Sequence, residues 1–166
     1  MKTLLTTQIT ALAVIILLSS ASGFAQNSPA TFDFWVGSWD AYWNDSLKGT
    51  NTITKAMNNK VVEENFVQND KGYFGKSWSV FDSAAGVWRQ TWVDDTGAYL
   101  SFTGGKEGDK VILSKTDSRK GKNGKEIFMR MVFFNIKQQS FDWDWQSSED
   151  GKNTWKTMWA IRYKRK

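Results

Sequence analysis

The feature that most constrains this chain is the even spacing of its turn-forming residues. From residue 44 onward, clusters of Asn, Asp, Gly and Ser separate runs of roughly 7 to 12 residues that are rich in β-branched and aromatic side chains. None of these runs repeats apolar residues with the period of an amphipathic helix. The only proline, Pro29, precedes the first run, so no expected strand lacks a backbone N–H donor. The pattern predicts an all-β domain.

Many short strands without helices are typical of a β-sandwich or an up-and-down β-barrel. Short connections favour antiparallel pairing of neighbours along the chain, and closure removes the two exposed edges of such a meander. We therefore expect a single up-and-down antiparallel barrel of about ten strands, wide enough to suggest a cavity. The expected strands are 33–43, 48–57, 60–68, 73–81, 87–93, 98–104, 110–117, 125–136, 140–147 and 154–164.

The first 25 residues have the pattern of a secretory signal peptide. Lys2 precedes the apolar run 9–18, and Gly23-Phe24-Ala25 places small side chains at the −3 and −1 positions of a cleavage site. The run is shorter than the roughly 20 residues that a spanning helix needs. We expect an exported chain, periplasmic or secreted, with no stable membrane insertion after cleavage. An uncleaved N-terminal anchor is the alternative.

The 166 residues contain no His and no Cys. This excludes Ser-His-Asp and Cys-His triads, zinc sites of the usual nitrogen and sulfur type, and haem or iron–sulfur clusters held by His or thiolate. It also excludes disulfides. We expect no cofactor and no metal site, and we assign no catalytic residue.

The formal net charge of +5 is unevenly distributed. Residues 106–125 contain seven Lys or Arg against three acids, and residues 162–166 add four more positive charges. Such a basic loop and tail are either solvated surface features or weak contacts for anionic lipids and glycans. Nucleic acid is not an expected partner, because the chain is expected to be exported and carries no recognised binding motif.

Several expected strands place tryptophans at every second position, which directs them to one face of the sheet. Such stripes are typical of a core filled with indoles. They also suit an aromatic-walled pocket for a small, mostly apolar ligand, because an indole offers a rigid stacking face and one N–H donor. The candidate ligand-binding residues on these stripes are Trp88, Gln90, Trp92, Trp143, Trp145 and Trp159.

Arg130 is a further candidate, because it lies mid-strand on a face that it shares with Phe128, Val132 and Phe134. One interpretation is a cavity cation that binds a ligand carboxylate in a bidentate manner. The other is a surface arginine or a structural ion pair. Glu64 is a possible counter-charge under either interpretation.

Three segments resemble the DUF1579-type exported proteins, a family of lipocalin-like (calycin) β-barrels. Residues 32–40 (FDFWVGSWD) resemble the opening strand, residues 88–97 (WRQTWVDDTG) the central segment, and residues 148–155 (SEDGKNTW) the closing hairpin. The resemblance implies a lipocalin-like barrel over residues 26–166 and no established activity. It also implies that Trp39, in the Gly-x-Trp element, closes one end. Related haem-binding barrels ligate iron through His, so haem binding is not expected here.

Three functions remain open. The chain is a carrier of a small ligand, a small isomerase or hydrolase that uses the same pocket, or a structural or surface-interaction protein with a solid aromatic core. A cavity above about 300 Å³ favours the first two over the third. A buried acid with a displaced pKa at that cavity favours the enzyme.

The export prediction is tested directly on secreted material. Cleavage after Ala25 should give an N-terminal sequence that starts at Gln26, because signal peptidase reads the small residues before that bond. N-terminal sequencing that still finds the apolar run 9–18 would contradict it.

Overall fold

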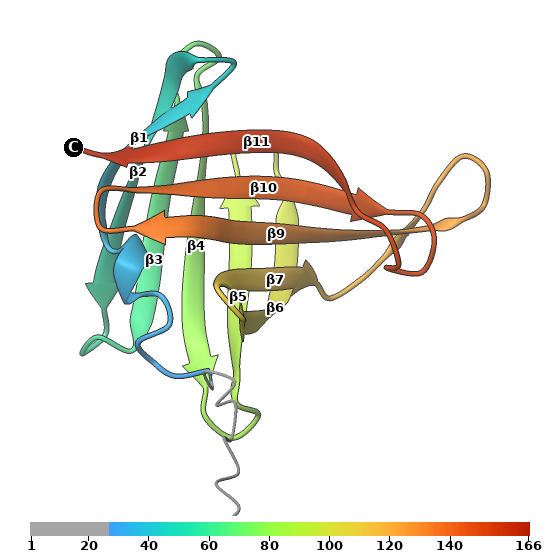
Figure 1. The fold of residues 1–166 in the computed structure, drawn as a ribbon, viewed down its shortest axis with the longest axis horizontal. Coiled ribbons are helices and arrows are strands. Elements are labelled where there is room, and N and C mark those ends of the chain that lie inside the picture. Colours follow the sequence, from blue (N-terminus) through green and yellow to red (C-terminus); the bar gives the residue numbers. More distant parts are fainter. Residues whose placement is uncertain (1–26) are drawn as a thin grey trace, which may run out of the picture.

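A computed structural model describes residues 27–166, and the predicted signal peptide, residues 1–25, lies outside them. The described residues form a closed, lipocalin-like antiparallel barrel of ten strands with one short extra strand (Figure 1). The predicted fold class is therefore confirmed. Within these residues, no helix is long and apolar enough to cross a membrane.

The chain enters the barrel through a single turn of 3-10 helix, η1 (Asp33–Trp35). Each barrel strand then pairs with the next along the chain, and Figure 1 shows β9 to β11 crossing in front of the earlier strands. The strands are β1 (Gly37–Trp43), β2 (Ser46–Ala56), β3 (Val61–Gln68), β4 (Tyr73–Asp82), β5 (Val87–Asp94), β6 (Tyr99–Glu107), β7 (Lys110–Lys115), β8 (Arg119–Lys120), β9 (Glu126–Lys137), β10 (Ser140–Ser148) and β11 (Lys156–Arg165).

The barrel closes where the first strand meets the last. β1 pairs antiparallel with β11, and Trp39 lies opposite Arg165 in the register. β10 pairs with both β9 and β11, which completes the ring. Each of the ten barrel strands thus has two neighbours, and the edge strands that a flat meander would expose are absent from the barrel.

The structure corrects two details of the expected strands. Residues 33–35, predicted as the start of a strand, form η1, and β1 begins at Gly37. Gly37 has a φ of +140°, and a Cβ atom there would overlap the guanidinium of Arg165. The second difference is β8, a two-residue strand in the basic segment that pairs with the start of β9.

One end of the barrel is filled by aromatic rings. The indole Nε1 of Trp39 donates a hydrogen bond to the carbonyl of Trp35 at 2.7 Å, and its ring meets Phe141 edge to face at a centroid distance of 4.8 Å. The position of Trp39 at this end agrees with what the family resemblance implies. The buried aromatic residues of this closed end are Phe32, Trp35, Trp39, Trp88, Phe133 and Phe141.

Arg165 fastens the last strand to this closed end. Its guanidinium carbon lies 4.1 Å from the centre of the Trp39 ring. Nη1 donates to the carbonyl of Val36 at 3.1 Å, Nη2 to that of Phe34 at 3.3 Å, and Nε to that of Gln138 at 2.9 Å. The basic tail is therefore partly a structural element rather than a free surface.

We expect Arg165→Met to destabilise the protein by about 2–4 kcal/mol, because it removes three charge-assisted hydrogen bonds to backbone carbonyls. Arg162→Met is the matched control, since Arg162 is exposed and makes only a surface ion pair with Asp142 at 3.2 Å. Urea unfolding of both variants measures the difference. Equal losses in the two variants would contradict a special role for Arg165.

Candidate functional site

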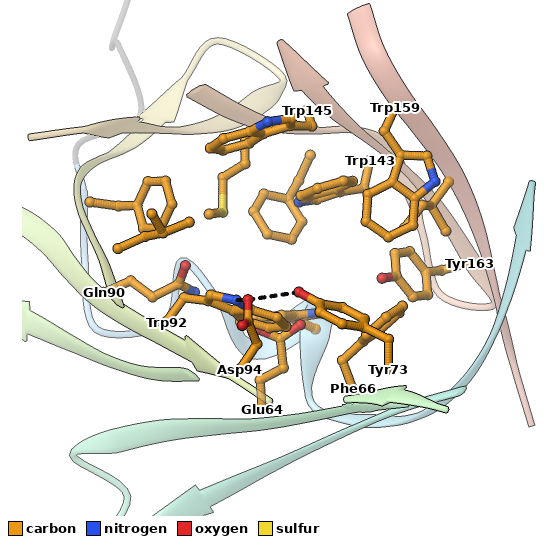
Figure 2. Close-up of a pocket in the computed structure, with 16 residues that line it drawn as sticks. Glu64, Phe66, Tyr73, Gln90, Trp92, Asp94, Trp143, Trp145, Trp159 and Tyr163 are labelled. Carbon is orange, nitrogen blue, oxygen red and sulfur yellow. Dashed lines mark hydrogen bonds between the residues drawn. The ribbon is translucent and has the colours of Figure 1, made fainter. Parts of the chain in front are cut away.

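The barrel contains a cavity of about 220 Å³ on the open side of the aromatic end (Figure 2). Its wall is mostly apolar, with a few polar groups on one side. The lining residues are Trp35, Glu64, Phe66, Tyr73, Gln90, Trp92, Asp94, Leu100, Phe102, Met131, Phe133, Trp143, Trp145, Trp159, Ile161 and Tyr163.

Small residues on the inner face of β4 leave the space for this cavity. Gly75, Ser77 and Ser79 are buried at alternate positions of β4, where other strands carry large side chains. A Cβ atom on Gly75 would overlap the indole of Trp92, so that ring lies directly against the β4 backbone. The cavity follows from this local shortage of side-chain volume.

Indole rings form the opposite wall, as Figure 2 shows above the cavity. Trp143 and Trp145, at alternate positions of β10, have nearly parallel rings with centroids 6.5 Å apart and an interplanar angle of 7°. Trp159 of β11 meets Trp143 edge to face at 5.7 Å. Aromatic contacts of this kind hold each ring in place, so the wall offers preformed apolar faces.

Gln90 brings an amide into the cavity from β5. Its side chain is 3% exposed, and Nε2 donates a hydrogen bond to Oγ of Ser79 at 2.9 Å. Its Oε1 atom is buried and has no hydrogen-bond partner among residues 27–166. An unpaired buried carbonyl oxygen is unfavourable in a folded protein. This atom is therefore a candidate contact for a ligand donor.

Glu64 of β3 adds a carboxyl group to the lining of the cavity, and is 8% exposed. Asn51 Nδ2 donates to Oε1 at 2.7 Å, and Ser77 Oγ donates to Oε2 at 2.6 Å. Burial raises the pKa of Glu64 above its usual value of 4.5, although both hydrogen bonds act in the opposite direction. Glu64 is thus a buried acid with a displaced pKa at the cavity.

Asp94 lies at the end of β5 and is held by five hydrogen bonds. Oδ2 accepts from Tyr73 Oη at 2.9 Å and from Trp92 Nε1 at 3.0 Å. Oδ1 accepts from the backbone and hydroxyl of Thr96 and from the backbone of Ala98. Burial acts to raise the pKa of Asp94, but these hydrogen bonds outweigh it and hold that pKa well below its usual range. Asp94 is a fixed negative charge.

The structure brings most of the predicted ligand-binding residues together. Gln90, Trp92, Trp143, Trp145 and Trp159 all line the cavity. Trp88 does not, although it shares the inner face of β5. It lies two residues closer to the closed end than Gln90, where its ring packs against Phe32 at 4.8 Å and its Nε1 donates to the carbonyl of Ser28.

The expectation that Arg130 supplies a cavity cation is corrected. The inner face of β9 is formed by Met131 and Phe133, and Arg130 points to the outside. There its Nε donates to Oε1 of Gln146 at 2.8 Å, and its guanidinium lies 4.0 Å from the ring centre of Trp155. The apolar neighbours of Arg130 belong to the outer face of β9.

Sequence reasoning missed the two acids of the cavity. Glu64 was considered only as a partner of Arg130, although its position between Val62 and Phe66 places it on the inner face of β3. Asp94 lies just beyond the expected strand 87–93, although it continues the alternation of Gln90 and Trp92 and belongs to β5. In both cases, the alternation of inward and outward side chains along the strand indicates that the acid faces inward.

A scan against models of known protein families and a search of curated proteins both found no match for this chain. Within the part of the chain that the structure describes, no group of three or more Asp, Glu, His or Cys is placed to hold a metal ion.

The raised pKa of Glu64 gives a test of its burial. Between pH 4.5 and that raised pKa the native state binds more protons than the unfolded state, so the stability conferred by protonated Glu64 is lost as pH rises. Tyr163, whose pKa burial also raises, stays neutral throughout. Glu64→Gln cannot ionise, and we expect it to be progressively more stable than the wild type as pH rises, by about 1.4 kcal/mol for each unit of pKa shift.

Thermal unfolding from pH 4 to 8 measures this difference. Glu63→Gln is the matched control, because Glu63 is partly exposed on the opposite face of β3. A Glu64→Gln variant whose stability relative to the wild type does not change with pH would contradict the burial cost.

Proposed function

We propose that this protein binds a small, mostly apolar ligand inside its barrel. The observation that carries the proposal is the cavity itself, whose walls are indole and phenyl rings and whose polar groups are few and grouped on one side. This arrangement is typical of sites that enclose an apolar molecule and orient it by a small number of hydrogen bonds. A protein with a solid aromatic core would have no need of the small residues on β4.

The volume limits the size of the ligand. At about 220 Å³ the cavity does not reach the roughly 300 Å³ that would by volume alone favour binding or catalysis over a solid core, so the proposal rests on its aromatic walls and grouped polar atoms. The cavity exceeds an engineered apolar cavity of about 150 Å³ that binds benzene. The ligand therefore has the size of one aromatic ring with a short substituent, or of a short alkyl chain.

Acid–base catalysis on the bound molecule is a second candidate function, and Glu64 is the observation that favours it. A buried carboxyl group with a raised pKa at a cavity is typical of a general acid or base. A catalytic Glu64 would make Glu64→Gln lose turnover while retaining ligand binding. A simple carrier shows no chemical change of its ligand during prolonged incubation, as followed by mass spectrometry.

The binding proposal is tested with 2-phenylethanol, a neutral molecule of suitable size, by calorimetry and by intrinsic tryptophan fluorescence. Trp143→Leu should weaken its binding roughly 5- to 100-fold, because the substitution removes a wall of the cavity. Trp78→Leu is the control, since Trp78 is 39% exposed on the outer face of β4. The Trp78→Leu variant should bind 2-phenylethanol with the same affinity as the wild type.

Unfolding of both variants is measured in parallel, because a buried large-to-small substitution also destabilises the fold. Equal, saturable binding of 2-phenylethanol by Trp143→Leu and Trp78→Leu would mean that it binds outside the cavity. Failure of every small molecule of this size, neutral or charged, to bind the wild type would contradict the proposed function.

A further inference from the structure

The charges that line the cavity have one sign. Glu64 and Asp94 are acidic, and no Lys or Arg of the described chain is among the lining residues. This is not a reflection of overall composition, because the chain carries 22 basic against 17 acidic residues. Arg130, the one basic side chain that was expected at the site, lies outside the barrel. The interior is therefore negative in a protein that is positive as a whole.

The polar side of the cavity offers acceptors, whereas the indole Nε1 of Trp35, at the closed end, is a buried donor that also lacks a partner in the described chain. Gln90 Oε1 is a buried acceptor without a partner in the described residues. Each Glu64 oxygen accepts one side-chain hydrogen bond, whereas a carboxylate has about four acceptor sites in total. Asp94 differs, because its five donors occupy both of its oxygens. A ligand thus meets free acceptors at Glu64 and Gln90 and an additional negative field from Asp94.

The aromatic wall favours the same sign of ligand charge. The faces of indole rings are negative, and a cation within about 6 Å of such a face is attracted to it, most strongly where water is excluded. Trp92, Trp143 and Trp159 present their rings around the space that Glu64 and Gln90 border, as Figure 2 shows. The same rings pack well against the apolar body of a small ligand.

From these observations we propose that the ligand is a small organic amine, whose ammonium group donates hydrogen bonds to Glu64 and Gln90 while its apolar body lies against the indoles. The inference rests on the proposed function and names the chemical class of ligand for the same site. It replaces the earlier expectation of a ligand carboxylate. A carboxylate would enter a cavity that carries two acids, and would find no described cation to pair with it.

Three probes of similar shape but different charge test the proposal at pH 7.5. These are 2-phenylethylamine, which is cationic, 2-phenylethanol, which is neutral, and 3-phenylpropanoate, which is anionic. We expect the amine to bind at least 10-fold more tightly than the alcohol, and the alcohol more tightly than the acid, as measured by calorimetry on the purified protein. Tryptophan fluorescence should report saturable binding of the amine.

Two variants assign the preference to Glu64. Glu64→Gln should remove most of the amine's advantage over the alcohol, and should leave the affinity for the alcohol within about threefold of wild type. Glu64→Gln can keep both local hydrogen bonds, because its amide accepts from Asn51 and donates to Ser77. Glu63→Gln makes the same change of net charge on the outer face of β3, and should leave all three affinities unchanged. Near-ultraviolet circular dichroism verifies that both variants are folded.

The outcomes separate this inference from the function on which it rests. An alcohol or acid that binds as tightly as the amine would overturn the amine assignment, while binding itself would support the proposed function. An amine preference that survives Glu64→Gln, or that Glu63→Gln also removes, would likewise overturn the role of the buried carboxyl group. Absence of binding by all three probes would contradict the proposed function, and the inference with it.

Discussion

The barrel depends on the contact of its last strand with η1 and β1, where the guanidinium of Arg165 covers the ring of Trp39 in β1. The β1–β11 seam contains four residue pairs, as β7–β9 does, against seven in the adjoining β1–β2 ladder. Arg165 adds hydrogen bonds to the carbonyls of Val36 and Phe34, 129 and 131 residues earlier in the chain. Because closing so long a loop is entropically costly, a short ladder benefits from a side chain that joins it to the aromatic end. The seam and the aromatic end therefore stabilise each other.

The same aromatic end determines where the cavity lies. Large rings, among them Phe32, Trp35 and Trp39, fill the barrel where η1 covers it. Further along the barrel, the small inward-facing residues of β4 do not fill the interior, and the unfilled volume is the cavity. Tyr73, Asp94 and Trp159 are partly exposed at this side of the cavity. Under the proposed function, this side would be the entrance for the ligand, and the aromatic end would serve stability.

The number and order of barrel strands could be predicted from the sequence, because turn clusters and two-residue alternation are local signals. That Gln90 and Trp92, and Trp143 and Trp145, share a face of their strands could be predicted for the same reason, whereas the inward direction of these faces is seen only in the closed barrel. What alternation does not encode is depth along the barrel axis, which depends on the stagger between strands. For that reason, Trp88 was grouped with the site although it lies beneath it.

Two further features escaped prediction because they depend on tertiary contacts. The outer face of β9 carries apolar residues of its own, so an apolar neighbourhood did not identify the face of Arg130. Strict alternation would place Trp155 on the same face as Trp159, which lines the cavity. A register shift at Trp145 and Gln146 breaks the alternation there, and the ring of Trp155 lies outside against Arg130. Bulges of this kind redirect every side chain beyond them.

Under the proposed amine binding, Glu64 links the stability of the barrel to the charge of its ligand. Burial makes the ionised carboxyl group unfavourable, and its hydrogen bonds from Asn51 and Ser77 offset only part of that cost. A proton on Glu64 removes this charge and brings no further ion into the cavity. An ammonium group also compensates the charge, but its own desolvation is an additional cost. The indole walls contact the apolar body of an amine and make no contact with a proton. These contacts would therefore decide whether an amine displaces the proton, and which amine binds.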